Sequence, residues 1–187
     1  TSIYNVTILV GDGTYVANTV NCRNIIGSGQ VIIRGNTTTP DNCIIDGCFS
    51  KTSPGTTYDI EGFKLIKSSG TQLVAINATN YAQLVVGYIN FGAGFIYHIY
   101  STACASVLIF TDYTISGSAT YHLFCSNGAS VSIEGNKAIT LVGSLTFNTF
   151  CFCLITGIFI GSGNTFTGTC TGTRYVADSN AVIYTSG

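Results

Sequence analysis

The sequence is poor in charge, and this excludes several classes of partner. Only 8% of its 187 residues are Asp, Glu, Lys or Arg, against about 25% in an average globular domain. Seven basic and eight acidic residues leave a formal net charge of −1. Without a basic patch, we expect the chain to bind neither nucleic acid nor anionic membrane surfaces.

Long apolar runs, methionine and tryptophan are missing as well. Gly, Asn, Ser or Thr interrupts every apolar run within a few residues, so no 18-residue span exists and no membrane insertion is expected. There is no Met and no visible signal peptide, so residues 1–187 are interpreted as a single domain taken from a longer chain. The missing Trp removes the side chain most used for stacking on sugars.

Cysteine is plentiful, but its spacing does not indicate a metal site. No CxxC pair occurs among the eight cysteines, and the two histidines are 24 residues apart, so no zinc site, other metal site or cofactor is expected. Because the chain has ample Val, Ile, Leu and Phe for a core, we expect most cysteines to be small buried side chains. Cys43 and Cys48 are the expected exception, as a disulfide that staples a loop.

A loose repeat of about two dozen residues organises the chain. At an offset of 24, residues 97–117 match residues 121–143, pairing Tyr97 with Tyr121 and Ile115 with Ile139. Residues 82–86 match 105–109 at an offset of 23, and residues 58–65 match 84–91 at an offset of 26. Apolar residues alternate within each run, which is typical of a coiled β solenoid.

The predicted fold is therefore all-β: a single-stranded, right-handed parallel β-helix of about eight coils, spanning 1–187. Strands are expected at 3–10, 29–36, 42–47 and 58–66, separated by Gly-, Asn- and Ser-rich turns. The expected inward-facing residues are Ile60, Leu84, Val86, Val107, Ile109, Val131 and Ile133.

Several segments resemble a known family. VTILVGDGTY (6–15), VIIRGNTTTPDNCIID (31–46) and IEGFKLI (60–66) resemble the opening coils of pectate-lyase-like right-handed β-helices. GNTFTGTCTGTRYVADSNAVIYTSG (163–187) resembles a terminal segment of bacteriophage tail fibres and tailspikes. The resemblance implies a parallel homotrimer in the phage tail, in contact with other tail proteins and with a host-surface glycan, and assembled in the host cytoplasm.

One pair of carboxylates has the spacing that glycan cleavage needs. Asp59 and Glu61 lie two apart in an expected strand, so about 6.5 to 7 Å separates them on one face, within the range used by glycosidases. If Ile60 points inward, both face solvent. A polar outer face of the strand, with Lys64 as an ordinary counter-charge, is the favoured interpretation, so Asp59 and Glu61 are weak catalytic candidates.

Histidines and aromatic residues give a second set of candidates. His98 and His122 occupy equivalent repeat positions, so we expect them to stack on adjacent coils about 5 Å apart. A side-chain ladder is favoured over a ligand site or a pH-sensitive pair. In FIYHIY (95–100) alternation must turn some rings outward, and His98, Tyr100, His122 and Phe124 are the predicted surface contacts.

Outward aromatic residues serve either sugar stacking or packing between subunits. The absence of Trp, the sparse carboxylates and the low charge favour packing. The sequence thus predicts a structural and adhesive module that takes part in host-surface recognition. A polysaccharide lyase or hydrolase on the same scaffold and an inert structural spacer are the alternatives.

Overall fold

The computed structural model describes residues 4–25, 28–69 and 73–185. Strands make up 64% of the structure and helix 2%. The strands form a parallel β-solenoid of about seven turns. The predicted strand at 58–66 is found as β5 with those same bounds, and the other expected strands are found with ends shifted by one to four residues. The strands are β1 (Tyr4–Leu9), β2 (Gly13–Asn21), β3 (Ser28–Arg34), β4 (Cys43–Lys51), β5 (Tyr58–Ile66), β6 (Val74–Ala78), β7 (Gln83–Phe91), β8 (Phe95–Ser101), β9 (Ser106–Ile109), β10 (Tyr113–Ile115), β11 (Ala119–Ser126), β12 (Ser130–Ile133), β13 (Ala138–Leu141), β14 (Leu145–Leu154), β15 (Ile158–Gly161), β16 (Thr165–Thr167), β17 (Cys170–Asp178) and β18 (Val182–Tyr184), with one 3-10 turn, η1 (Pro40–Asn42), before β4.

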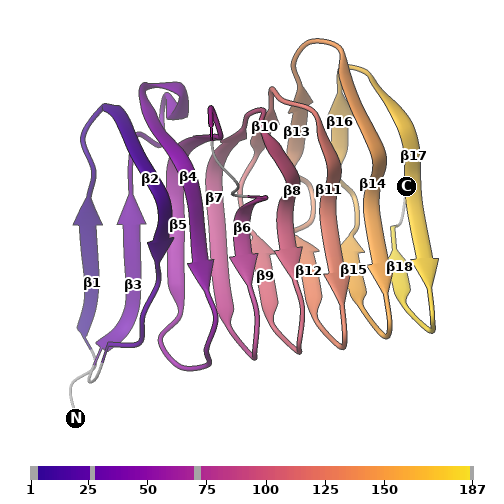
Figure 1. The fold of residues 1–187 in the computed structure, drawn as a ribbon, viewed down its shortest axis with the longest axis horizontal. Coiled ribbons are helices and arrows are strands. Elements are labelled where there is room, and N and C mark those ends of the chain that lie inside the picture. Colours follow the sequence, from indigo (N-terminus) through magenta and orange to yellow (C-terminus); the bar gives the residue numbers. More distant parts are fainter. Residues whose placement is uncertain (1–3, 26–27, 70–72, 186–187) are drawn as a thin grey trace.

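The coils stack along the long axis of the molecule, with β1 at one end of the stack and β18 at the other (Figure 1). Every strand pairing is parallel, and the pairings build three faces. Face A contains β1, β3, the first halves of β5 and β7, then β9, β12, β15 and β18. Face B contains the first halves of β2 and β4, the ends of β5 and β7, then β10, β13 and β16. Face C contains the second halves of β2 and β4, then β6, β8, β11, β14 and β17.

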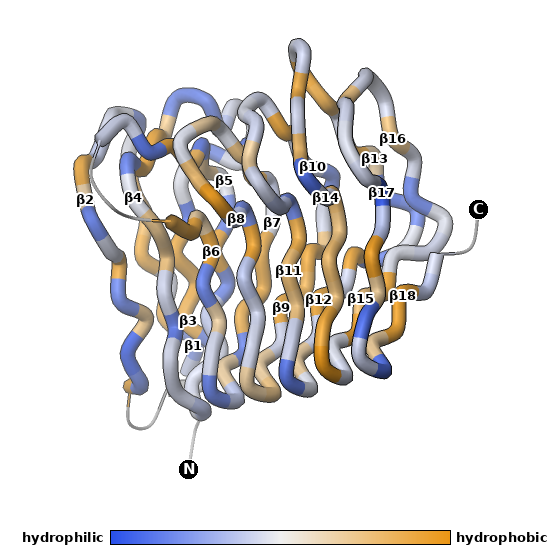
Figure 2. The backbone as a smooth tube through the Cα atoms, turned by 45° about the vertical axis from the view of Figure 1, so that its right-hand side comes forward, coloured by the Kyte–Doolittle hydropathy of each residue, from blue (hydrophilic) through white to orange (hydrophobic). Residues whose placement is uncertain are grey.

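The core runs along the inside of this stack. Hydrophobic segments recur in successive coils at β9, β12, β15 and β18 (Figure 2). The seven residues predicted to face inward are all at most 2% exposed: Ile60, Leu84, Val86, Val107, Ile109, Val131 and Ile133. The predicted all-β parallel β-helix is therefore confirmed, with about seven coils in place of eight. Fewer coils fit because several of them carry loops beyond the 24-residue repeat, such as residues 52–57.

The register confirms most of the repeat. Tyr97 pairs with Tyr121 and Val107 with Val131, as the offset of 24 predicts. The prediction for Ile115 is wrong, because it pairs with Leu141 and not with Ile139. Tyr113 pairs with Ile139, so residues 134–138 correspond to residues 110–112. This segment is two residues longer, and the offset becomes 26 beyond that point.

A ladder of two-residue turns forms the corner where face C leads into face A. Both residues of each turn have positive φ, with values of 47° to 72°. The amide of the second residue donates to the carbonyl of the first residue one coil later, as from Tyr81 to Ala103 and from Cys104 to Asn127. The corner thereby extends the hydrogen bonding of the sheets through the turns. Its members are Asn80–Tyr81, Ala103–Cys104, Asn127–Gly128, Ile155–Thr156 and Ser179–Asn180.

The predicted Cys43–Cys48 disulfide is absent, since both cysteines are free. They lie five apart on the single strand β4, and each contacts the preceding coil: the Cys43 thiol is 3.3 Å from the Gly11 carbonyl oxygen, and the Cys48 thiol is 3.7 Å from the Thr19 hydroxyl. Six of the eight cysteines are buried, which confirms their expected role as small core residues, and Cys104 and Cys170 are exposed.

Within the described ranges, no helix is both long and apolar enough to cross a membrane.

Candidate functional site

The structure changes the interpretation of the carboxylate pair on β5. Ile60 is fully buried, as expected, but Glu61 is only 4% exposed, so the expectation that both carboxylates face solvent is wrong for Glu61. Arg34 lies beside Glu61 in the parallel register of β3 and β5, and its Nε donates to Glu61 Oε1. Lys64 is not the counter-charge of this pair, since its Nζ lies 2.9 Å from Asp41 Oδ1.

Asp59 is an unusual carboxyl group. Its neighbours in register are Ile32 on β3 and Val85 on β7, so apolar side chains flank it on both sides. Its Oδ1 is buried without a hydrogen-bond partner. Burial, with the Glu61 carboxylate as a smaller cause, raises the pKa of Asp59 to about 6. A raised pKa beside a second carboxylate is the arrangement of a general acid and its partner.

His98 and His122 are both fully buried, so their predicted role as surface contacts is wrong. Inside–outside alternation breaks in β8, where Ile96 and Tyr97 both lie toward the outside and His98 and Ile99 both lie in the core. The predicted ladder is confirmed, because the two imidazole rings lie on adjacent coils with centroids 5.2 Å apart.

The histidines belong to one directional hydrogen-bond chain. The Gly92 carbonyl can only accept, so His98 Nε2, 3.2 Å away, carries the proton. His98 Nδ1 then accepts from His122 Nδ1 at 3.0 Å, and His122 Nε2 accepts from the Tyr113 hydroxyl at 3.0 Å. Every ring nitrogen is satisfied while both rings are neutral. Burial lowers the pKa of His98 to about 3 and lowers that of His122 well below its usual value.

The outer side of face C carries a cluster of aromatic rings, which we call the aromatic face. Its members, all half-buried, are Tyr97 and Tyr100 on β8, Tyr121 and Phe124 on β11, and Phe152 on β14. Parallel register places Phe124 between Tyr100 and Phe152 on neighbouring coils. Tyr100 and Phe124 were predicted surface contacts, and both lie here. Tyr97, Tyr121 and Phe152 were not predicted, although the repeat that equates Tyr97 with Tyr121 was a signal for a stacked pair.

The rings of the aromatic face stack on one another. Tyr97 and Tyr121 have ring centroids 5.3 Å apart at an interplanar angle of 11°, and Tyr100 and Phe124 have centroids 5.1 Å apart at 6°. Stacking along the long axis turns the flat surface of each ring toward its neighbour in the next coil. Ring edges and Tyr hydroxyls are therefore left for contact with a partner, and this suits packing against another protein surface better than stacking on a sugar.

Face C is also uncharged over a long stretch. The strands β6, β8, β11 and β14 contain no Asp, Glu, Lys or Arg. A surface that is depleted in charged residues and rich in Tyr and Phe resembles the centre of a protein–protein interface. The combination of half-buried aromatic residues and missing charge makes the aromatic face the strongest candidate functional site.

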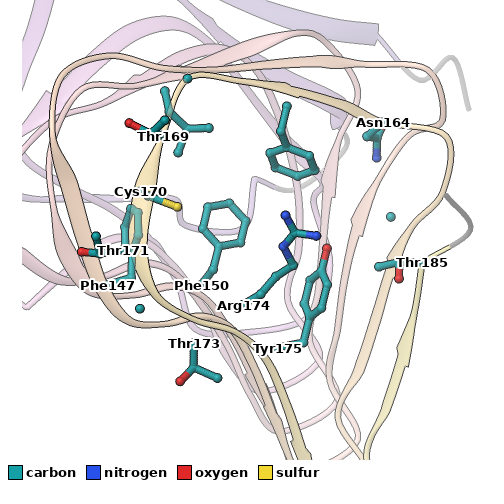
Figure 3. A pocket seen from close by; sticks show the side chains of 15 residues that line it. Phe147, Phe150, Asn164, Thr169, Cys170, Thr171, Thr173, Arg174, Tyr175 and Thr185 are labelled. Carbon is teal, nitrogen blue, oxygen red and sulfur yellow. The ribbon is translucent and has the colours of Figure 1, made fainter.

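A cavity of about 560 Å³ opens at the last described coil. Phe147, Phe150 and Tyr175 line it together with Arg174, whose side chain lies beside the Tyr175 ring (Figure 3). Inner side chains of this coil have no further coil against them within the described residues. The cavity is thus the open end of the core rather than a cleft between elements.

Among the residues that the structure describes, no group of three or more His, Cys, Asp or Glu side chains is placed to hold a metal ion.

Comparisons with family models, with curated proteins and with solved structures find no match.

Proposed function

We propose that this chain is a structural and adhesive module of the kind found in bacteriophage tail fibres and tailspikes, carried in the virion and directed toward the host surface. The observation that carries the proposal is the aromatic face, an uncharged outer sheet of stacked rings along a stiff parallel solenoid.

In this proposal the aromatic face packs against sister subunits in a parallel homotrimer. Five half-buried rings would become buried at the interface. No charged group would be desolvated on β6, β8, β11 or β14, because these strands contain none. Three chains side by side would present three copies of any surface contact, so individually weak contacts with a host glycan would combine. Other tail proteins would then meet the ends of the trimer.

A polysaccharide-cleaving enzyme is the second candidate, and Asp59 favours it. A carboxyl group with a pKa of about 6 beside Glu61 is suited to donate a proton near neutral pH. Against it, Glu61 is buried in an ion pair with Arg34. Neither Asp59 nor Glu61 lines the cavity at the last described coil.

One experiment separates these functions. The purified chain is incubated with a panel of bacterial surface polysaccharides, and both retention on the polysaccharide and the length of the sugar chains are measured. Retention without shortening is the expected result. Shortening that disappears in Asp59→Asn or Glu61→Gln would establish the enzyme, and neither retention nor shortening would leave a structural spacer.

A further inference from the structure

A second surface, on face B, has the composition of a small polar binding site. A groove of about 270 Å³, which we call the Tyr88 groove, lies where the loop before β4 meets the outer side of face B. Its polar lining comes from four segments of the chain and includes Asp41, Tyr88, Asn90, Asp112, Thr114 and Thr140. The geometry points to a subsite for a short stretch of saccharide built from neutral or amino sugars, a ligand assignment that rests on the proposed adhesive function.

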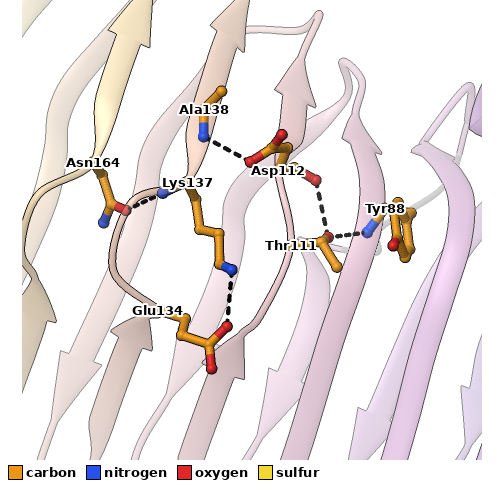
Figure 4. Close-up of polar contacts among 7 residues, drawn as sticks. All are labelled: Tyr88, Thr111, Asp112, Glu134, Lys137, Ala138 and Asn164. Atoms are coloured by element: carbon orange, nitrogen blue, oxygen red, sulfur yellow. Dashed lines mark hydrogen bonds and ion pairs between the residues drawn. The ribbon is translucent and has the colours of Figure 1, made fainter.

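Tyr88 supplies an aromatic surface from a costly backbone conformation. Its φ is 51°, in the left-handed region that non-glycine residues seldom adopt, and its side chain is 41% exposed. The equivalent residue one coil earlier is Gly62, with φ 78°, because Glu61 pairs with Gly87 and Phe63 with Ile89. The Thr111 hydroxyl stabilises this conformation by accepting a hydrogen bond from the Tyr88 amide at 2.6 Å (Figure 4). Tyr88 therefore carries a bulky ring at a position where the backbone conformation favours glycine.

The polar groups around the ring are held in place by the protein. Asp41 Oδ1 accepts from Lys64 Nζ at 2.9 Å and from Asn90 Nδ2 at 2.7 Å. Asp112 Oδ1 accepts from the Ala138 amide at 2.8 Å (Figure 4). Each carboxylate thus has one oxygen bound, while its Oδ2 has no hydrogen-bond partner among the described residues. Fixed acceptors of this kind are ready to receive sugar hydroxyls without losing further side-chain entropy.

Hydroxyl groups extend the groove along the long axis. Thr114 and Thr140 pair in register on β10 and β13, so their side chains lie one coil apart, about 4.8 Å. That separation is close to the length of one sugar residue in an extended glycan. The volume is slightly below the ~300 Å³ at which typical small-molecule sites begin. A segment of a longer glycan that passes through the groove fits better than a free, fully enclosed ligand.

Charge selects among saccharides. Lys64 is engaged by Asp41 and Lys137 by Glu134, at 2.9 Å in each case, so Asp112 leaves the groove with excess negative charge. Carboxylates accept hydrogen bonds from hydroxyl and amino groups but repel carboxylate and sulfate. Neutral sugars and amino sugars are therefore the expected ligand class, and sugar acids are disfavoured.

The test uses the full chain on an array of neutral, amino-bearing and acidic oligosaccharides, with Tyr88→Gly as the main variant. Glycine suits the left-handed backbone, so this variant removes the ring without straining the fold. Tyr81→Gly is the matched control, because Tyr81 also has positive φ (59°) and is 65% exposed, but it lies on the corner between faces C and A. Neutral or amino glycans should be retained, with retention reduced about tenfold in Tyr88→Gly and unchanged in Tyr81→Gly.

A further variant tests selectivity. Asp112→Asn keeps an oxygen for the Ala138 amide and removes the charge, so it should reduce the discrimination against acidic glycans. Retention of acidic glycans alone, no retention of neutral or amino glycans, or equal retention by Tyr88→Gly would overturn the assignment. Sedimentation of the same samples keeps the two proposals apart: a trimer that binds no neutral glycan refutes the groove only, whereas a monomer that binds through Tyr88 refutes the trimer only.

Discussion

His98 Nδ1 and His122 Nδ1 lie 3.0 Å apart across two adjacent coils, in a core where neither side chain is exposed. The contact works only when one nitrogen carries a proton and the other does not. A second proton on His98 would place two N–H groups against each other, at its Nδ1 and at His122 Nδ1. A second proton on either ring would bury a positive charge among aromatic rings such as Phe91, stacked 5.3 Å from His98.

Acid should therefore destabilise the fold through these histidines. The folded-state pKa of His98 is about 3, and that of His122 is also lowered, whereas the unfolded chain titrates near 6.5. Below pH 6.5 the unfolded state binds protons that the folded state excludes, so stability is lost as pH falls from 6.5 toward 3. We expect about 1.4 kcal/mol per pH unit for each histidine, measured by urea unfolding at pH 7, 5.5 and 4.5.

The control for this pH dependence removes the whole chain of hydrogen bonds. The variant His98→Leu/His122→Leu/Tyr113→Phe removes the polar groups of all three side chains together, so none of them is left buried without its hydrogen-bond partner. Its stability should vary less between pH 6.5 and 4.5 than that of the unchanged protein. An equally steep profile in both proteins would assign the acid sensitivity to other groups.

The inward side of β12 should tolerate no charge. Ile133→Asp should abolish folding, because an unpaired buried charge costs several kcal/mol and Ile133 is 2% exposed. Ser132→Asp, one residue away on the outer side of the same strand, should fold. Circular dichroism and thermal melting compare the two variants, and a folded Ile133→Asp protein would refute the inner position of this residue.

Close contact between the first two coils leaves no room for a side chain at Gly47. A Cβ on Gly47 would lie 1.4 Å from the Ala17 carbonyl oxygen, whereas the nearest contact of a Cβ on Gly135 would be the Ser162 carbonyl oxygen at 3.4 Å. Gly47→Ala should lower stability by about 1–3 kcal/mol through forced backbone shifts, and Gly135→Ala should change it little. Equal melting temperatures for the two variants would contradict the packing of β2 on β4.

Asp59 should destabilise the fold near neutral pH. Its folded-state pKa, about 6, is above the unfolded value of 3.8, so any stabilisation from the protonated carboxyl is full below pH 3.8 and is lost as pH rises through 6. Asp59→Asn should therefore raise the melting temperature at pH 7 by more than it does at pH 4. An identical effect of the substitution at the two pH values would show that Asp59 is not perturbed.

The fold was more predictable than the surface, for a physical reason. Inner residues such as Val107 and Val131 repeat because each coil must fill the same space, so periodicity identifies them. His98 is the exception: in FIYHIY it reads as a polar, outward residue, but the break in alternation at Tyr97 turns it inward, and its partner His122 comes from the next coil. Glu61 was misjudged similarly, since Arg34, 27 residues earlier, is its partner.

The candidate sites needed the third dimension for the same reason. The stack of Tyr100, Phe124 and Phe152 depends on parallel register across three coils. The repeat offset supplies the first pairing, but the second spans 28 residues because β14 follows a longer coil. The Tyr88 groove joins Asp41 to Asn90, 49 residues apart, through a loop that no periodicity describes.

Sedimentation equilibrium tests the role of the aromatic face most directly. The protein is compared with Tyr100→Ser/Phe124→Ser, which removes two stacked rings from the outer side of face C, and with Tyr81→Ser, which removes an exposed ring from a corner. We predict a trimer for the unchanged protein and for Tyr81→Ser, and dissociation toward monomer for the double variant while its circular dichroism spectrum is retained. A monomer at every concentration, or a trimer that persists in the double variant, would contradict assembly through the aromatic face.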